Sequence, residues 1–372
     1  MQASRYMDQK NRRLIILAAA AGLVALLVLA LLGVFGGSNR QMSAVHLRCT
    51  ATQDVTPFGD NVLYYDGMTL FCLDNRGNER WSYTVGNSAS FSCSESLIAA
   101  WSGSQLHFID RNGHSTYHDI LPDTVQFARV GAKYVAIVVG NDVSPSLQIK
   151  DLQGTSVDNE SSKFQDMIML DVGFFGDGEY LWATSVDIYG TAPDVTLNTF
   201  LVNMRNTGTV SLGENLTYGI VYAGSKLNVI STRQLRQYDY RGTIDPNGTV
   251  LVYGWQMIDH AVNGGAPMLL FAPNLQLDET GTINELRLLS GKKEDRRYSL
   301  PNSCVSAALY NRRIYAFASD MVYRADINAQ RFTAVALPNS MGSSVITGYL
   351  GMLKNGVALL ASDNDVYAVT LP

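Results

Sequence analysis

The sequence predicts an all-β protein, an eight-bladed β-propeller with seven blades as the alternative, preceded by one transmembrane α-helix. Three observations support this prediction. A long apolar segment lies near the N-terminus, a strand-turn-strand motif recurs through the rest of the chain, and a spare strand stands ahead of the first full repeat. The motif recurs about every 42 residues, a period typical of propeller blades.

The first predicted element is a membrane anchor at residues 14–36. No charged residue occurs from Leu14 to Gly37, and at the rise of an α-helix the run from Leu14 to Phe35 spans about 33 Å, the thickness of a bilayer core. A cleavable signal peptide is the alternative, but its apolar stretch is shorter and ends in a small-x-small site, which "GVFGGSNRQ" lacks. We therefore expect an uncleaved signal anchor.

Charge on the two sides of this segment predicts its orientation. Arg5, Lys10, Arg12 and Arg13 against Asp8 give residues 1–13 a charge of +3. By the positive-inside rule these residues form a cytoplasmic tail, 37–43 a linker, and 44–372 an extracytoplasmic propeller at the cell membrane. The net charge is −5, so the remainder has −8. An acidic exported domain excludes general nucleic-acid binding.

The repeat is clearest in "LFCLDNRGNERWSYTV", residues 70–85. Two alternating apolar runs flank a D-x-x-G turn, in which Asp accepts main-chain hydrogen bonds and Gly supplies the positive φ that closes the turn. An aromatic residue follows four positions after the Gly. The two best copies of the motif consist of Asp74, Gly77 and Trp81, and of Asp110, Gly113 and Tyr117.

Looser copies extend the pattern to eight units, and the ends of the chain predict ring closure. The fifth and sixth units are irregular, which keeps seven blades open. The last unit has three strands, whereas full units have four. We expect Val45–Thr50 to supply the missing strand by pairing antiparallel with Val366–Leu371, which removes an exposed sheet edge.

Asp74, Gly77, Glu79 and Trp81 in "LDNRGNERW" resemble the D-x-x-x-G-K-E-x-W repeat of pyrroloquinoline-quinone (PQQ) propellers, with one turn residue fewer. Over residues 44–372 the chain is similar to an uncharacterised bacterial family of single-pass, membrane-anchored proteins with a quinoprotein-like propeller. That family has no assigned activity, so the resemblance implies architecture and location. In PQQ propellers the tryptophan docks between neighbouring blades.

The sequence favours a protein without a catalytic site, cofactor or metal. Quinoprotein dehydrogenases of similar fold use a vicinal disulfide, and no two cysteines of this chain are adjacent. His114 and His118 lie about 13 Å apart along a strand, too far to share a metal ion. Local signatures of hydrolases, zincins and P-loop enzymes are missing.

Cys72, Cys93 and Cys304 occupy predicted strands among apolar neighbours, which indicates small buried thiols. In an exported domain disulfides are possible, and Cys72–Cys93 is the pairing we expect if one bridge exists. The four cysteines are Cys49, Cys72, Cys93 and Cys304.

Two insertions, Val186–Asn198 and Gln256–Gly281, lengthen the fourth and sixth units, and long loops frequently bind partners. We expect them to flank one face of the ring; the alternative for the second is an extended hairpin packed on its own blade. The candidate contact residues are Val186, Tyr189, Asp194, Met257, Met268 and Phe271.

The function that the sequence favours is a protein-interaction scaffold or ligand-binding module at the cell envelope, with other envelope proteins as partners. The alternative is an enzyme or small-molecule sensor with its site in the central channel. A buried cluster of charged residues with perturbed pKa values at the channel would favour that class.

Overall fold

The computed structural model describes residues 42–160, 163–214, 216–263, 265–274, 281–291 and 294–372. The predicted cytoplasmic tail (1–13), membrane anchor (14–36) and most of the linker lie outside these residues. Among the residues that are described, no helix combines the length and hydropathy needed to cross a bilayer. Residues Ser43–Leu371 form one compact unit.

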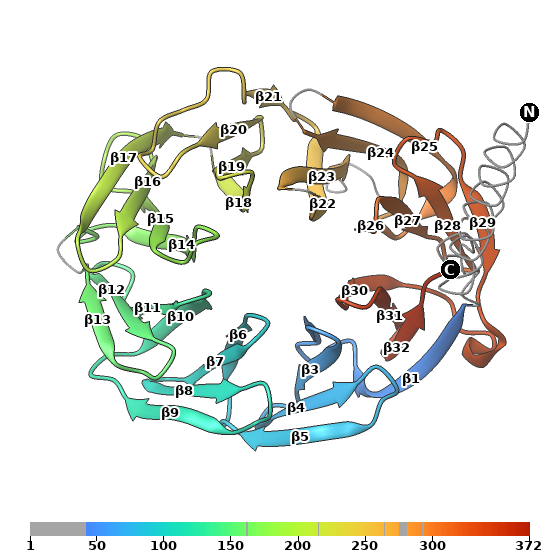
Figure 1. Ribbon diagram of the computed structural model, residues 1–372, viewed down its shortest axis with the longest axis horizontal. Coiled ribbons are helices and arrows are strands. Elements are labelled where there is room, and N and C mark those ends of the chain that lie inside the picture. The colour runs from blue at the N-terminus through green and yellow to red at the C-terminus, as the bar shows by residue number, and fades with distance from the viewer. Residues whose placement is uncertain (1–41, 161–162, 215, 264, 275–280, 292–293) are drawn as a thin grey trace, which may run out of the picture. The chain divides into compact units, whose positions relative to one another are not determined.

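That unit is a ring of eight antiparallel sheets of four strands each, numbered here as blades 1–8 from the N-terminus (Figure 1). The prediction of an eight-bladed propeller is confirmed. In blades 1–7 the strands run in chain order from the innermost to the outermost.

The strands of the first half are as follows. Blade 1 contains β2 (Thr56–Phe58), β3 (Asn61–Tyr65), β4 (Thr69–Asp74) and β5 (Glu79–Thr84). Blade 2 contains β6 (Ser90–Cys93), β7 (Leu97–Ser102), β8 (Gln105–Asp110) and β9 (Ser115–Ile120). Blade 3 contains β10 (Val125–Val130), β11 (Tyr134–Gly140), β12 (Pro145–Asp151) and β13 (Ser156–Asn159). Blade 4 contains β14 (Ile168–Phe174), β15 (Tyr180–Asp187), β16 (Asp194–Leu201) and β17 (Arg205–Gly213).

The second half completes the ring. Blade 5 contains β18 (Thr217–Ala223), β19 (Lys226–Ser231), β20 (Gln234–Tyr238) and β21 (Val250–Leu251). Blade 6 contains β22 (Trp255–Asn263), β23 (Ala266–Pro273), β24 (Ile283–Ser290) and β25 (Glu294–Cys304). Blade 7 contains β26 (Ser306–Tyr310), β27 (Arg313–Phe317), β28 (Met321–Asp326) and β29 (Thr333–Ala336). Blade 8 contains β30 (Gly348–Met352), β31 (Val357–Ser362), β32 (Asp365–Thr370) and β1 (Ser43–Thr50), and a 3₁₀ helix, η2 (Asn339–Met341), precedes it.

The second strand of each blade is the most apolar because neighbouring blades cover both of its faces. β11, for example, is buried from Val135 to Val139, and its side chains alternate between two cores. Val135, Ile137 and Val139 pack toward blade 2, whereas Ala136 and Val138 pack toward blade 4. The outer strands are instead half exposed, as β5 shows.

The ring is closed by β1, as predicted. This strand pairs antiparallel with β32, with Val45 opposite Ala368 and Leu47 opposite Val366. Leu47 is fully buried in the core shared by blades 8 and 1. The first and last strands of the propeller are therefore held together in one sheet. β1 covers the edge of β32 that would otherwise be unpaired.

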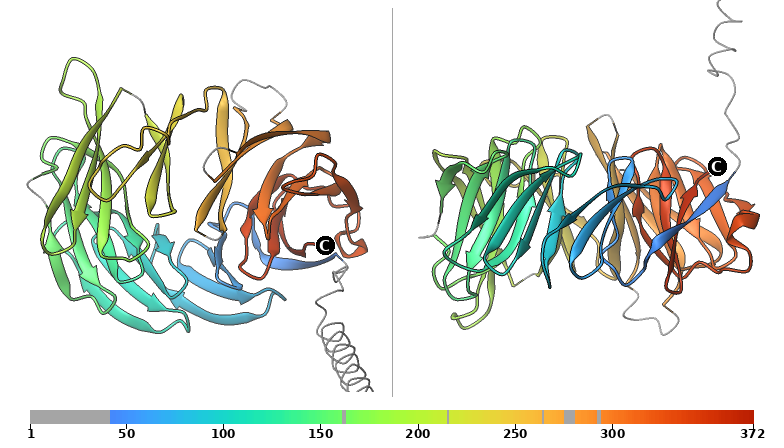
Figure 2. Two further views of the ribbon diagram at one scale, coloured as in Figure 1. Left: turned by 45° about the horizontal axis from the view of Figure 1, so that its top comes forward. Right: turned by 90° about the horizontal axis from the view of Figure 1, so that it is seen from below.

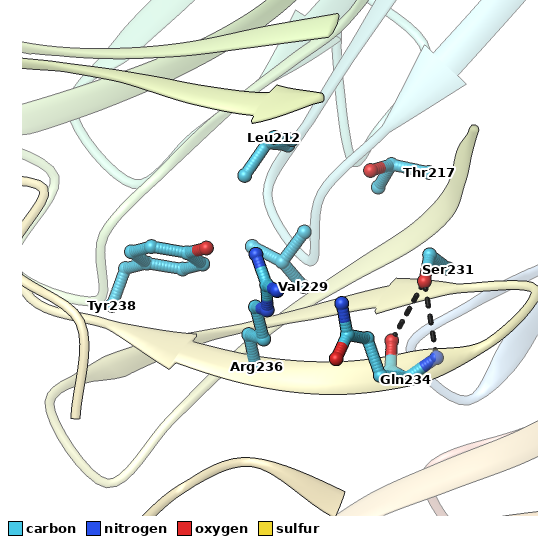
Figure 3. Close-up of a pocket in the computed structure, with 7 residues that line it drawn as sticks. All are labelled: Leu212, Thr217, Val229, Ser231, Gln234, Arg236 and Tyr238. Atoms are coloured by element: carbon cyan, nitrogen blue, oxygen red, sulfur yellow. Dashed lines mark hydrogen bonds between the residues drawn. The ribbon is translucent and has the colours of Figure 1, made fainter. Parts of the chain in front are cut away.

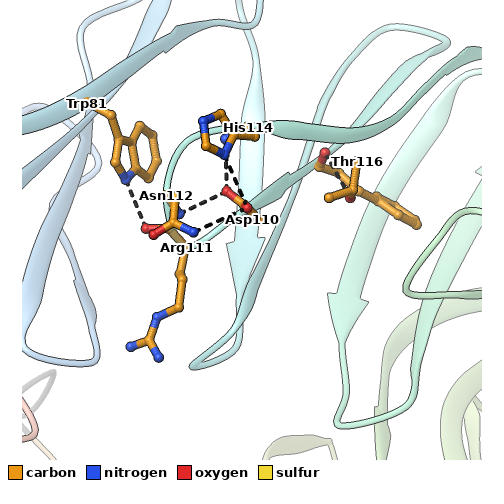
Figure 4. Close-up of polar contacts among 7 residues, drawn as sticks. Trp81, Asp110, Arg111, Asn112, His114 and Thr116 are labelled. Carbon is orange, nitrogen blue, oxygen red and sulfur yellow. Dashed lines mark hydrogen bonds and ion pairs between the residues drawn. The ribbon is translucent and has the colours of Figure 1, made fainter.

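The D-x-x-G turns have the geometry that their sequence predicts, as the second copy shows (Figure 4). A carboxylate oxygen of Asp110 accepts hydrogen bonds from the main-chain N–H groups of Asn112 and His114, both at 2.8 Å. The Gly113 N–H donates to the Asp110 carbonyl at 3.0 Å, with φ of +85° at Gly113. Asp74 in blade 1, Asp151 in blade 3 and Asp239 in blade 5 accept equivalent hydrogen bonds.

All four cysteines are free, and three of them are buried. Cys72 and the half-buried Cys93 contribute to the same core between blades 1 and 2 without a bridge, so the conditional Cys72–Cys93 pairing is not formed. Burial raises the pKa of the Cys72 and Cys304 thiols to about 12 and that of Cys49 and Cys93 to about 11. Neutral thiols of this kind are poor nucleophiles.

Antiparallel pairing divides the connections between two faces of the ring, which the edge-on view in Figure 2 separates. We call the face with the second-to-third-strand and blade-to-blade connections the crossover face. The other face, with the first-to-second and third-to-fourth connections, is the hairpin face. Ser43 and Thr370, which pair with one another, lie at the hairpin face.

Candidate functional site

The first predicted insertion forms a connection on the crossover face. β15 and β16 extend through most of it, and the six residues Ile188–Pro193 join them. Tyr189 is 62% exposed in this connection, whereas Val186 is buried at the end of β15 and cannot contact a partner. Asp194, half-buried, accepts a hydrogen bond from the Ser211 hydroxyl at 2.6 Å. Of these three candidates, Tyr189 is the accessible apolar one.

The described part of the second insertion is mostly a hairpin, which corrects the expectation that Met268 and Phe271 are accessible to a partner. β22 and β23 pair along their length, as in the alternative of an extended hairpin. Phe271 is fully buried and Met268 is 5% exposed, because β23 is the second strand of blade 6 and is covered on both sides. Met257 is half-buried in the core between blades 5 and 6. Residues 275–280 lie outside the described residues.

Exposed apolar side chains concentrate on the crossover face. Of the fifteen large apolar residues that are exposed in the described part of the chain, four lie at the hairpin face: Met204, Tyr240, Ile244 and Val262. The other eleven lie in, or within three residues of, a connection on the crossover face: Met68, Ile120, Val143, Leu170, Ile188, Tyr189, Leu216, Tyr218, Leu251, Tyr253 and Val345. Eight of these, from Val143 to Tyr253, belong to blades 3–5.

Hydrogen bonds order the connections of blades 3 and 4. The Asp166 N–H donates to the Val143 carbonyl at 3.0 Å, which joins the two blades. A carboxylate oxygen of Asp187 accepts from the Tyr189 N–H at 2.9 Å and fixes the start of the β15–β16 connection. These connections surround a hollow of about 390 Å³ lined by Gln165, Asp166, Met167, Asp187 and Tyr189. We call the exposed apolar residues of blades 3–5 and this hollow the crossover surface.

Sequence reasoning found Tyr189 but missed most of the crossover surface. Val143 and Leu216 are single apolar residues in short connections ("NDVS", "GENLT"), and Tyr253 has one apolar neighbour in "VYG". Isolated apolar residues are common on protein surfaces, so none is informative alone. The signal emerges when the strand order assigns every connection to one of two faces.

A larger cavity, of about 860 Å³, lies between blades 5 and 6. It forms where β21, the outer strand of blade 5, shortens to two residues. On one wall Lys226 pairs with Asp245, and the Gln237 amide donates to Asn228 Oδ1 at 2.8 Å. Leu269, Leu289 and Pro267 contribute to the other wall. Its volume is within the range of small-molecule sites.

A second pocket, between blades 4 and 5, is too small to hold a small-molecule ligand (Figure 3). Its volume is about 10 Å³, which is room for one water molecule at most. The Ser231 hydroxyl on its wall is engaged, donating to the Gln234 carbonyl at 2.9 Å and accepting from the Gln234 N–H at 3.1 Å.

The innermost strands hold two half-buried carboxylates at equivalent positions next to β-bulges, Asp171 in β14 and Asp259 in β22. Burial raises the pKa of both. Asp171 pairs with Arg129 of blade 3 at 3.0 Å, and Asp259 accepts a hydrogen bond from the Leu309 N–H of blade 7 at 2.7 Å. Each links its blade to a neighbour. Within the described ranges, no three His, Cys, Asp or Glu side chains are grouped as metal ligands.

His118 is exposed on β9, directly opposite the buried His107 of β8. The two imidazoles stack with ring centroids 4.3 Å apart, and His107 Nδ1 lies 3.0 Å from the Tyr83 hydroxyl of blade 1. Burial, followed by repulsion from His118, lowers the pKa of His107 to about 4. His114 instead lies beside Asp110.

Comparisons with known proteins establish the fold and go no further. No family model and no curated protein matches the sequence. Among solved structures, Sqt1 from Saccharomyces cerevisiae is similar to 89% of this chain over 100% of its own, with 10% identity and a TM-score of 0.56. BamB from Moraxella catarrhalis matches 89% of this chain and 97% of its own, with 10% identity and a TM-score of 0.53.

The hydrazine synthase of Kuenenia stuttgartiensis covers 81% of this chain and 98% of its own, with 9% identity and a TM-score of 0.50. These similarities show the β-propeller fold. Because an enzyme occurs among them, the fold does not distinguish a catalytic protein from a binding protein.

Proposed function

We propose that this protein is a non-catalytic, membrane-anchored propeller that binds partner proteins outside the cytoplasm, at the cell envelope, through the crossover surface. The observation that supports the proposal most directly is the segregation of exposed large apolar side chains, eleven on one face and four on the other among the described residues. Exposed apolar groups are costly in water, and where they gather they mark interaction sites. The connections that present them are ordered by main-chain hydrogen bonds.

Sequence supports the location. The uncharged run at 14–36 is long enough to span a bilayer, and four basic residues precede it. A C-terminal fusion to alkaline phosphatase, an enzyme that requires disulfides formed outside the cytoplasm, is expected to be active. An inactive phosphatase together with an active cytoplasmic reporter at the same position would contradict the proposed orientation.

Partner binding is tested by placing a photo-crosslinking amino acid at Tyr189 or Leu216 in living cells. Matched controls are Met204 and Tyr240, which are exposed at the hairpin face of blades 4 and 5. We expect discrete crosslinked species from the crossover positions and none from the controls. Equal capture from both faces, or no capture from Tyr189 and Leu216, would refute the proposal.

Small-molecule binding is the second candidate, supported by the cavity between blades 5 and 6. Leu269→Trp would fill part of that cavity from the wall of blade 6. If the cavity binds a ligand, this variant abolishes the stabilisation that the ligand gives in thermal unfolding and leaves crosslinking at Tyr189 unchanged. A site in the central channel has less support, because Asp171 and Asp259 are both engaged in links between blades.

A further inference from the structure

Charge on the crossover face of blades 3–5 extends the proposed function. The connections of these blades, with the strand residue on either side of each, contain two cations on this face, Lys163 and Arg233. They contain seven carboxylates, Asp123, Asp142, Glu160, Asp166, Asp187, Asp194 and Glu214. The same segments on the hairpin face are nearly balanced. They contain five carboxylates, Asp151, Asp177, Glu179, Asp239 and Asp245, and four cations, Lys133, Arg205, Lys226 and Arg241.

The two faces also differ in how their charges are compensated. On the hairpin face Glu179 pairs with Lys133 at 2.8 Å, and Asp245 pairs with Lys226. On the crossover face, none of the seven carboxylates has an ion pair within 4.0 Å in the described part of the chain. Carboxylates that outnumber the cations on one face create a negative potential that attracts cations and repels anions.

The carboxylates surround apolar groups rather than a polar surface. Asp142 precedes the exposed Val143, Asp187 precedes Ile188 and Tyr189, and Glu214 stands two residues before Leu216. The 390 Å³ hollow combines both kinds of group, with Met167 and Tyr189 beside Asp166 and Asp187. A ligand complementary to this surface needs large apolar side chains and positive charges at alternating short intervals.

We infer that the partner docks on the crossover surface with a cationic segment in which Lys or Arg residues flank large apolar side chains. This inference rests on the proposed function. The apolar side chains enter the hollow beside Tyr189, and the cations lie over the surrounding carboxylates. Electrostatic complementarity of this kind mainly raises the association rate and selects against acidic partners.

The test measures binding of three fluorescent 14-residue peptides to the full chain. One alternates Lys and Leu around a central Trp, a second replaces Leu and Trp by Ser, and a third replaces Lys by Glu. We expect the first peptide to bind, and its affinity to fall about tenfold from 50 to 300 mM salt as the charges are screened. The other two bind at least about tenfold more weakly, since each lacks one half of the complementarity.

A matched pair of charge variants localises the binding. D123N/D142N/D166N neutralises three exposed carboxylates of the crossover face. The control, D177N/E179Q/D239N, removes three carboxylates from the hairpin face while keeping the oxygens that accept turn hydrogen bonds. The first variant should weaken binding of the Lys/Leu peptide about tenfold and the control should not.

Absent binding of the Lys/Leu peptide, equal binding of the Glu/Leu peptide, or equal effects of the two variants would overturn the inference. Crosslinking from Tyr189 in cells separates this failure from failure of the proposed function. If crosslinking from Tyr189 persists in D123N/D142N/D166N, the proposed interaction surface is retained. The inference that the partner binds through a cationic segment is then wrong.

Discussion

The indole N–H of Trp81 in blade 1 donates a hydrogen bond, 3.0 Å long, to the main-chain carbonyl of Arg111 in blade 2 (Figure 4). The same ring covers Gly113, so closely that a Cβ atom on that glycine would lie 2.6 Å from the indole. Tyr117 covers Gly154 of blade 3 in the same way. The aromatic residue of one repeat is thus the packing partner of the next repeat's turn, which joins successive blades.

This contact predicts a large cost for Gly113→Ala. The residue has a φ of +85°, which an L-residue rarely adopts, and the new methyl group would overlap the indole. Strain and overpacking together should lower the free energy of unfolding by about 2–4 kcal/mol, measured by urea denaturation.

Gly103→Ala is the matched control because Gly103 also has a positive φ, +59°, but nothing lies within 4 Å of an added Cβ. It should cost only the backbone strain, about 1 kcal/mol. Equal destabilisation by the two variants would show that the docked indole contributes nothing beyond the turn.

Ring closure gives the second prediction. Leu47→Ala removes a fully buried side chain from the only strand of blade 8 that comes from the start of the propeller. We expect a loss of about 2–5 kcal/mol. Hydrogen exchange should show β1 and β32 losing protection together, since they share one ladder. Ser43→Ala, at an exposed position of β1, is the control; loss of protection in β1 alone would argue against coupled closure.

The propeller fold can be predicted from the sequence because each blade repeats the same turn and strand patterns. Asp110 and Gly113 define a turn, alternating runs define the flanking strands, and the three-stranded last unit requires Val45–Thr50. The sequence is misleading where one pattern is compatible with two structures. Met268 and Phe271 are candidate contact residues by sequence, yet a short apolar run is equally typical of a strand buried on both faces, which is where they lie.

The candidate site was harder to predict than the fold because it depends on long-range placement. Val143 and Tyr189 are 46 positions apart, and it is the propeller that brings their connections to one face. His107 and His118 stack because β8 and β9 pair in a register that places them opposite each other. Strand register depends on the whole sheet. Spacing along one strand therefore predicts the distance between His114 and His118, but not which residue of the next strand lies opposite His107.

Asp259 provides a third prediction, about the link between blades 6 and 7. Its carboxylate accepts hydrogen bonds from the N–H groups of Leu309, at 2.7 Å, and His260, at 2.8 Å. Asp259→Ala leaves the Leu309 N–H without this acceptor and should cost about 1–3 kcal/mol in urea denaturation. Asp123→Ala, at an exposed position, should change stability by less than about 0.5 kcal/mol. Similar values for both would mean that solvent replaces the Asp259 oxygen at no cost.

His107 predicts a loss of stability in mild acid. Its pKa is about 4 in the folded chain against an ordinary value of 6.5, so between these pH values the unfolded chain binds the extra proton. Stability due to the neutral imidazole is therefore complete above about pH 6.5 and declines as the pH falls toward 4; from pH 7.5 to pH 5 the loss is about 2 kcal/mol. His107→Phe should remove this part of the pH dependence, while His114→Gln, at an exposed position, should retain it. Urea denaturation at pH 7.5, 6 and 5 measures the difference, and parallel pH profiles for His107→Phe and the unmodified chain would show that His107 does not cause the decline.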